Sequence, residues 1–167
     1  MLNSGFGDLA VGTIDLYPGE LREEIDALNA LIYPALNNGV YRAGFATTQV
    51  AYEEAFHDVF AMLDELEGRL GDGRNFLVGD RFTEADVRLF VTLVRFDAAY
   101  HGLFKCNLRR IANYPALSAY QARILAMPGV RDTVSIDHIK RGYYSIRALN
   151  PTGIVPVGPK LAAALAG

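Results

Sequence analysis

The sequence predicts an all-α protein, and three observations support this fold class. Apolar residues recur at helical spacing in several long segments. Residues that cap or end helices stand between these segments, and no run of alternating polar and apolar residues indicates a sheet. The chain has 167 residues and a hydrophobic fraction of 51%, which is enough for one compact domain with a core. We expect a connector at 1–17, a helical domain at 18–149 and an extended tail at 150–167.

Five helices account for the apolar periodicity. We place them at 18–34, 47–71, 83–100, 114–127 and 130–145. Pro18 suits a first helical turn, because the N–H that proline lacks would be unpaired there. We expect the first helix to break at Asn37-Asn38-Gly39 and Gly142 to interrupt the fifth. The prolines and glycines that follow Asn150 predict extended coil.

The start of the third helix carries the sharpest local signal, in the stretch RFTEADVRLF at 81–90. Thr83 is a good N-cap residue, and Asp86 stands three positions later, as in a capping box. Phe82 and Val87 have the spacing of a hydrophobic staple around the same cap. The helix is apolar over most of its face, which is typical of a buried helix. We therefore expect it to be the central helix of the fold.

Composition excludes several classes of function. The net charge is −3 and the pI is about 5.6, so no basic excess directs the chain to nucleic acid or anionic lipid. We expect no membrane association, because no apolar run is long enough to cross a bilayer. The N-terminus lacks the features of a signal peptide, so a cytoplasmic location is expected. The single cysteine, Cys106, and three scattered histidines do not make a metal site.

Four stretches of the chain resemble one family. FLVGDRFTEADVRLF (76–90) is similar to the core of the C-terminal, all-helical half of glutathione transferases, which also occurs in non-catalytic translation factors and synthetase-associated proteins. The stretches NNGVYRAGFATTQVAY (37–52), TLVRFDAAYHGLFKCN (92–107) and HIKRGYYSIRALNPTGIVPVGP (138–159) narrow the resemblance. Together they resemble the glutathionyl-hydroquinone reductases, the Xi class of glutathione transferases. The resemblance covers about residues 2–159.

The resemblance implies a fold and an activity. The fold would be a glutathione transferase C-terminal-like helical bundle. The activity would be glutathione-dependent reduction of glutathionyl-hydroquinones, with glutathione as cosubstrate and no metal. Family members begin with a thioredoxin-like domain that carries the catalytic cysteine and the glutathione groove, and nothing in these 167 residues corresponds to it. We expect this chain to be the C-terminal half of such an enzyme, cut near an internal Met, and to be inactive alone.

Further expectations follow from the family, and two alternatives stay open. The family forms homodimers, so a homodimer is expected. An exposed apolar surface is expected on the first and third helices, where the other half would lie. The alternatives are a stand-alone, non-catalytic binding or interaction module, and a half-enzyme that meets a separate thioredoxin-like partner.

The resemblance also implies roles for named residues around a small aromatic substrate. Tyr41 matches a tyrosine that donates and accepts the proton. Tyr100 and Tyr143 match tyrosines that lower the pKa of the catalytic cysteine. Tyr144 is next to Tyr143 and is kept as a pocket candidate beside it, and His138 stands one short turn earlier. The competing interpretation of each tyrosine is a core aromatic whose hydroxyl is hydrogen-bonded within the fold.

Three other residues, Arg42, Arg95 and Cys106, each allow a functional and a structural interpretation. Arg42 and Arg95 have the charge to bind a carboxylate of glutathione, but ion pairs within the fold, for example with Asp97, are the simpler use. Cys106 has basic neighbours in sequence, which favour a thiolate. The family places its catalytic cysteine in the other domain, so we interpret Cys106 as a structural thiol.

Overall fold

The computed structural model describes residue 7 and residues 14–159. In this part of the chain the regular structure is helical and includes no strand, which confirms the all-α fold class. Residues 150–159 form neither helix nor strand. Most of the predicted connector, at 1–6 and 8–13, and the last part of the predicted tail, at 160–167, lie outside the described residues.

Six α-helices and several short helical turns build the described fold. The α-helices are α1 (Arg22–Ile32), α2 (Gly39–Gly44), α3 (Gln49–Leu70), α4 (Glu84–Arg95), α5 (Pro115–Leu125) and α6 (Ile136–Tyr144). Single 3-10 turns lie at Gly19–Leu21, Ile111–Asn113 and Arg131–Thr133. Two π-helical turns continue α1 and α4 directly, Tyr33–Asn37 and Phe96–Tyr100.

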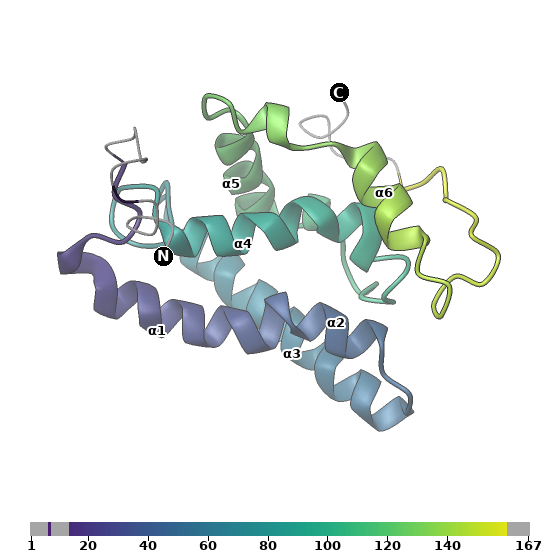
Figure 1. The fold of residues 1–167 in the computed structure, drawn as a ribbon. Coiled ribbons are helices and arrows are strands. Elements are labelled where there is room, and N and C mark those ends of the chain that lie inside the picture. Colours follow the sequence, from purple (N-terminus) through teal and green to yellow (C-terminus); the bar gives the residue numbers. More distant parts are fainter. Residues whose placement is uncertain (1–6, 8–13, 160–167) are drawn as a thin grey trace.

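The predicted break at 37–39 coincides with a boundary between elements, because the π-helical turn ends at Asn37 and α2 begins at Gly39. The helical course nevertheless continues past Pro34. Proline has no N–H for an ordinary α-helical bond, and π-helical turns occur as single-turn irregularities within α-helices. The Asn38 N–H instead reaches the Tyr33 carbonyl, five residues back, at 2.8 Å. Figure 1 shows α1 and α2 following one another across the lower part of the molecule. Tyr41 consequently lies on a helix.

α3, α4 and α5 begin close to their predicted starts, whereas α6 begins at Ile136 and not at the predicted residue 130. One predicted interruption is also misplaced. The Thr48 side chain caps α3 by accepting the Ala51 N–H at 3.3 Å. Gly142 lies inside α6, so the prediction of a break there is wrong. The interruption falls before α6, where the Ser135 hydroxyl caps the helix by accepting the His138 N–H at 3.3 Å.

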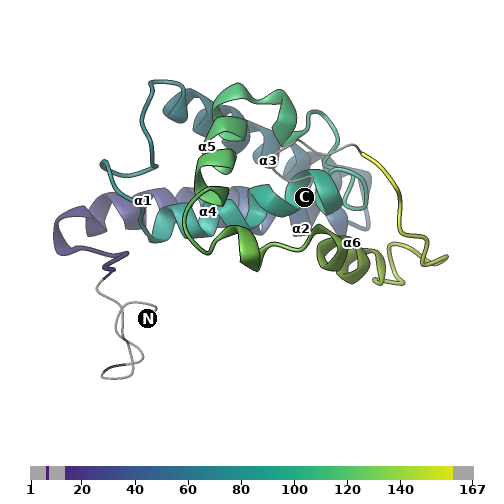
Figure 2. The ribbon, with the colours of Figure 1, turned by 90° about the horizontal axis from the view of Figure 1, so that it is seen from above.

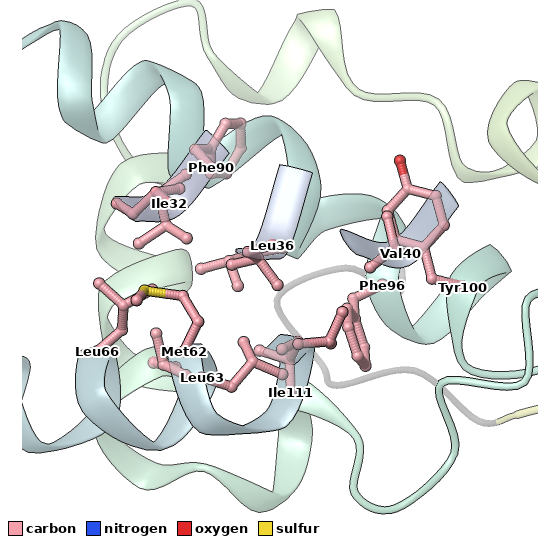
Figure 3. Packing of buried hydrophobic residues seen from close by; sticks show 14 of the residues in the cluster. Ile32, Leu36, Val40, Met62, Leu63, Leu66, Phe90, Phe96, Tyr100 and Ile111 are labelled. Carbon is pink, nitrogen blue, oxygen red and sulfur yellow. The ribbon is translucent and has the colours of Figure 1, made fainter. Parts of the chain in front are cut away.

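α4 lies across the middle of the fold. Figures 1 and 2 show α1 on one side of it and α5 crossing it on another, and both helices contact α4. α6 packs against the π-helical turn that follows α4. Figure 3 shows the core between these elements, with Leu36, Leu63 and Phe96 fully buried. Tyr100 lies at the edge of this cluster, and its hydroxyl points away from the apolar residues.

One buried carboxylate holds the start of α4. One oxygen of Asp86 accepts the Thr83 N–H at 2.8 Å and the Thr83 hydroxyl at 3.0 Å. The other accepts the Leu77 N–H at 2.9 Å and the Tyr120 hydroxyl at 2.8 Å. The predicted capping box is therefore formed, and the same carboxylate also binds the preceding loop and α5. Burial raises the pKa of Asp86, although its hydrogen-bond donors act in the opposite direction.

Replacing Asp86 by Asn should destabilise the fold. The new amide nitrogen would face donors that the carboxylate now accepts, and leaving a buried donor unpaired costs about 1–3 kcal/mol. We expect the free energy of unfolding to fall by about 2–3 kcal/mol, measured by urea denaturation at fixed protein concentration. D80N, at an exposed position of the preceding loop, is the matched control and should change stability by less than about 0.5 kcal/mol. An unchanged urea midpoint for D86N would contradict the role given to this carboxylate.

Candidate functional site

Three tyrosine hydroxyls from different parts of the chain meet at one point. Tyr41 comes from α2, Tyr100 is the last residue of the π-helical turn after α4, and Tyr143 comes from α6. The Tyr143 hydroxyl lies 2.7 Å from that of Tyr41 and 2.7 Å from that of Tyr100. The Tyr41 and Tyr100 hydroxyls are 3.5 Å apart. The three tyrosines named from the sequence thus form one hydrogen-bonded cluster.

One phenylalanine, Phe104, contacts the rings of all three tyrosines. Phe104 stacks on Tyr100 with a centroid distance of 5.3 Å and an interplanar angle of 29°. It meets Tyr41 at 5.2 Å and Tyr143 at 5.8 Å in edge-to-face geometry. Gly44 makes room for Phe104, because a Cβ added at Gly44 would lie 2.4 Å from the ring. Sequence reasoning missed Phe104, which lies in the turn at 101–104 that follows Tyr100.

The three tyrosines differ sharply in exposure. The exposed fraction is 2% for Tyr100 and 39% for Tyr41, and Tyr143 is intermediate. Burial raises the pKa of Tyr100, and its hydrogen bonds to the other two tyrosines add to the shift. Burial also raises the pKa of Tyr143 to about 12, although the hydrogen bond with Tyr100 and the nearby Arg95 charge act against the shift. Both groups therefore stay protonated at neutral pH.

The cluster borders two adjoining cavities of about 560 and 540 Å³. Both are within the size range of small-molecule sites. Tyr41, Tyr143, Val91 and Arg95 line both cavities. The larger one lies between α4 and the region from the 3-10 turn at 131–133 to α6, and its remaining walls are Phe90, Val94, Thr133, Val134, Ser135, His138, Ile139, Gly142 and Ile146. The smaller one is completed by Tyr33, Asn37, Arg88, Thr92 and Tyr100.

The two other pocket candidates lie in different surroundings. His138 lines the larger cavity. Tyr144 lines neither of these cavities; it is buried, and its hydroxyl lies 2.7 Å from where a Cβ at Gly102 would stand. Consecutive residues of an α-helix point about 100° apart, so Tyr143 and Tyr144 face different neighbours. We therefore leave Tyr144 out of the pocket proposed below.

The two candidate arginines have different partners. Arg42 binds Glu54 and Asp58, each at 2.9 Å, and so takes part in an ion-pair network within the fold. Arg95 does not pair with Asp97. The Asp97 carboxylate turns into the fold, where it accepts the Ile111 N–H at 2.7 Å. The Arg95 guanidinium donates to the carbonyl of Val91 on its own helix.

Cys106 has the properties of a structural thiol. Its side chain is buried, and burial raises the pKa of the thiol to about 12, so very little of it is thiolate at neutral pH. Among the residues that the structure describes, no group of His, Cys, Asp and Glu could hold a metal ion. The helices in this part of the chain also fall short of the length and apolarity that crossing a bilayer requires.

Comparison with known families identifies the class of protein. The family model described as "Glutathione S-transferase, C-terminal domain" matches residues 49–123. Solved structures of glutathione transferases superpose on most of the chain, with the glutathione-bound YqjG of Escherichia coli K-12 at a TM-score of 0.92 and 47% identity. That match covers 97% of this chain and 53% of the other. Residues 49–123 therefore match the C-terminal domain of glutathione transferases, and the described helices have the fold of that domain.

The similar proteins include glutathionyl-hydroquinone reductases and Xi-class glutathione transferases. The chain is 59% identical to glutathionyl-hydroquinone reductase PcpF of Sphingobium chlorophenolicum over 160 residues, 95% of this chain and 51% of that protein. It is 48% identical to glutathionyl-hydroquinone reductase YqjG of Escherichia coli over 160 residues, 95% of this chain and 48% of that protein. The Xi-class structure from Phanerochaete chrysosporium matches at a TM-score of 0.90 and 46% identity, over 96% of this chain and 52% of that one. The chain spans about half the length of the curated relatives that it matches.

Because the pKa of Tyr143 is raised, we predict that the free energy of unfolding decreases at high pH. Above the ordinary tyrosine pKa of 10.0, Tyr143 ionises in the unfolded chain while it stays protonated in the folded one, up to about pH 12. The unfolded state then binds fewer protons, so the free energy of unfolding falls as the pH rises through this window. In Y143F this contribution is absent, and the fall between pH 9 and 11 should be smaller, as measured by urea denaturation. An equal or steeper fall in Y143F would contradict the shift.

Proposed function

We propose that this chain supplies the aromatic-substrate half of a glutathione-dependent enzyme that reduces glutathionyl-hydroquinones. The observation that carries the proposal is the cluster of three tyrosine hydroxyls, two of whose members, Tyr41 and Tyr143, line a cavity of about 560 Å³. The names of two close relatives support the substrate class. The proposed pocket residues are Tyr41, Tyr100, His138 and Tyr143. Glutathione would be the cosubstrate, held mainly by a thioredoxin-like domain of the kind that the family carries.

The apolar walls of the larger cavity suit an aromatic ring. Phe90, Val94 and Ile139 contribute carbon surface, whereas Tyr41 and Tyr143 contribute hydroxyl groups that lie 2.7 Å apart. A hydroquinone has the same division, with an apolar ring face and hydroxyl groups at its edge. Pockets of this kind, mostly apolar with a few convergent polar groups, are typical of small-molecule sites.

The proposed reaction needs a thiolate from the other domain and a proton at the ring. The thiolate attacks the sulfur of the conjugate and forms a mixed disulfide with glutathione, while the ring carbon takes the electron pair of the broken carbon–sulfur bond and a proton. A second glutathione releases the enzyme thiol by disulfide exchange, which yields glutathione disulfide. The tyrosine cluster would supply the proton to the ring and hydrogen bonds to the sulfur.

Counting protons in the cluster favours Tyr41 as the donor. Each hydroxyl has one proton, and Tyr143 lies 2.7 Å from both of the others. Because Tyr100 is buried, its hydroxyl would donate its hydrogen bond to Tyr143. The Tyr143 hydroxyl would in turn donate to Tyr41. The proton of Tyr41 is then left for a substrate, on the most exposed of the three residues. A phenol hydroxyl can donate its proton to a developing anion.

The chain alone should not catalyse this reaction. Its single cysteine is Cys106, and a buried thiol with a pKa of about 12 is a poor nucleophile. The exposed side chains of Leu31, Tyr33 and Val91, on the helical run of α1 and on α4, lie where the second domain is expected to pack. We also propose a cytoplasmic location, which the free, buried Cys106 supports. A homodimer is proposed from the resemblance to the family.

A chimera tests the proposed function. The N-terminal half of PcpF, joined ahead of this chain, should release hydroquinone from its glutathione conjugate, whereas the chain alone should not. Y41F in the chimera should lower kcat by about 10²-fold or more, because general acid catalysis contributes factors of that size. The measurement is the rate of hydroquinone release by chromatography.

Y52F is the matched control for the chimera. The Tyr52 hydroxyl donates to the Lys105 carbonyl at 2.8 Å, away from both cavities, so its loss should leave the rate unchanged. A folded chimera that binds glutathione but leaves the conjugate intact would exclude the proposed reaction and favour a non-catalytic binding module. Equal rates for Y41F and the parent chimera would remove Tyr41 from the proposed role.

A further inference from the structure

The two cavities carry positive charge and no negative charge. None of the residues that line them is Asp or Glu. The arginines among them are Arg88, in the smaller cavity, and Arg95, in both. Arg88 is paired, because its guanidinium donates to the Glu84 carboxylate at 2.9 and 2.6 Å on the same helix. Arg95 therefore provides the uncompensated charge.

Arg95 has no carboxylate within ion-pair distance among residues 14–159. Its nearest acidic neighbour in sequence, Asp97, is committed to the backbone N–H groups of Ile111 and Ala112 at 2.7 and 3.3 Å. The Arg95 side chain donates a hydrogen bond to the carbonyl of Val91. A guanidinium presents several N–H donors in a fixed plane, so most of these donors stay available to a ligand.

The surroundings of Arg95 favour an anion that is attached to an aromatic ring. The side chain is only partly exposed, and Phe90 and Val94 line the same cavity. The partial burial of Arg95 strengthens a charge–charge contact relative to one on the open surface. The guanidinium also acts on Tyr143, whose phenol forms part of the cluster, so it stands beside the proposed position of the ring.

We propose that Arg95 selects aromatic substrates that carry an anionic ring substituent, such as a carboxylate. This inference rests on the proposed function, because it assigns a specificity residue to the same pocket. A planar carboxylate on the ring matches the fork of the guanidinium and can accept two parallel hydrogen bonds. The apolar walls hold the ring, and Arg95 discriminates between rings by their charge.

The test uses the 167-residue chain and a pair of probes that differ in charge and have nearly the same shape. The probes are 2,5-dihydroxybenzoate and its methyl ester, titrated by isothermal calorimetry at pH 7 and low salt. The anionic probe should bind about tenfold more tightly than the ester, and added salt should reduce this ratio. R95Q should bind both probes equally, and R95K should keep a reduced preference, because it retains the charge without the planar fork.

R123Q is the matched control. Arg123 lies on α5 outside both cavities, and like Arg95 it donates to a backbone carbonyl, that of Asn75 at 2.9 Å. The same loss of charge at Arg123 should leave the tenfold ratio intact. Circular dichroism spectra that match the parent protein show that the variants are folded.

The outcomes separate this inference from the proposed function. Equal affinities of the parent chain for both probes would overturn the role of Arg95 and leave the aromatic pocket standing. A preference that survives in R95Q, or disappears equally in R123Q, would overturn it as well. Binding of neither probe would overturn both the pocket and the selection by Arg95.

Discussion

The described fold depends on one buried carboxylate. Asp86 accepts hydrogen bonds from the Thr83 cap, from the loop at Leu77 and from Tyr120 on α5, so a single side chain joins three segments. Removing this carboxylate from water is unfavourable, and the raised pKa records that cost. The donors offset it only while all of them are correctly placed. This requirement fixes the register of α4, and α4 in turn positions Val91 and Arg95 at the cavities and leads to Tyr100.

The site depends on a second group of polar contacts at the other end of the same helical run. The Tyr100 ring packs against the core and stacks on Phe104. Its hydroxyl consequently points away from the apolar residues. Tyr143 meets it from α6, and Tyr41 meets both from α2. The hydroxyls are thus oriented before any ligand arrives, and such preorganisation is what makes hydrogen-bond donors effective in catalysis.

Much of the helical layout could be predicted from sequence, because caps and apolar spacing are local signals. Thr48 and Thr83 mark true helix starts, and the Thr83–Asp86 pair is a formed capping box. The errors came from residues whose effect depends on context. Pro34 is accommodated by a π-helical turn, and Gly142 is tolerated inside α6 at the edge of a cavity.

The candidate site was predictable in its members but not in its geometry. The tyrosines were named from a family resemblance. Tyr41 is 59 positions from Tyr100 and 102 positions from Tyr143 in sequence, and no local sequence pattern predicts that these residues meet. The choice between Tyr143 and Tyr144 depends on the rotation of α6, which α6 acquires only when it packs. Arg95 could not be assigned either, because an apparent partner two residues away, Asp97, turns to a different set of backbone groups.

The two π-helical turns make the site depend on backbone geometry. Each turn holds one more residue than an α-helical turn would, and each lies next to a member of the tyrosine cluster: Tyr33–Asn37 precedes the helix of Tyr41, and Phe96–Tyr100 ends in Tyr100 itself. If either turn relaxed to α-helical geometry with the same number of residues, the residues after it would rotate by about 100°. The phenols would then point in different directions, with every side chain still present. The tyrosine cluster therefore requires two irregular turns of the backbone as well as its own side chains.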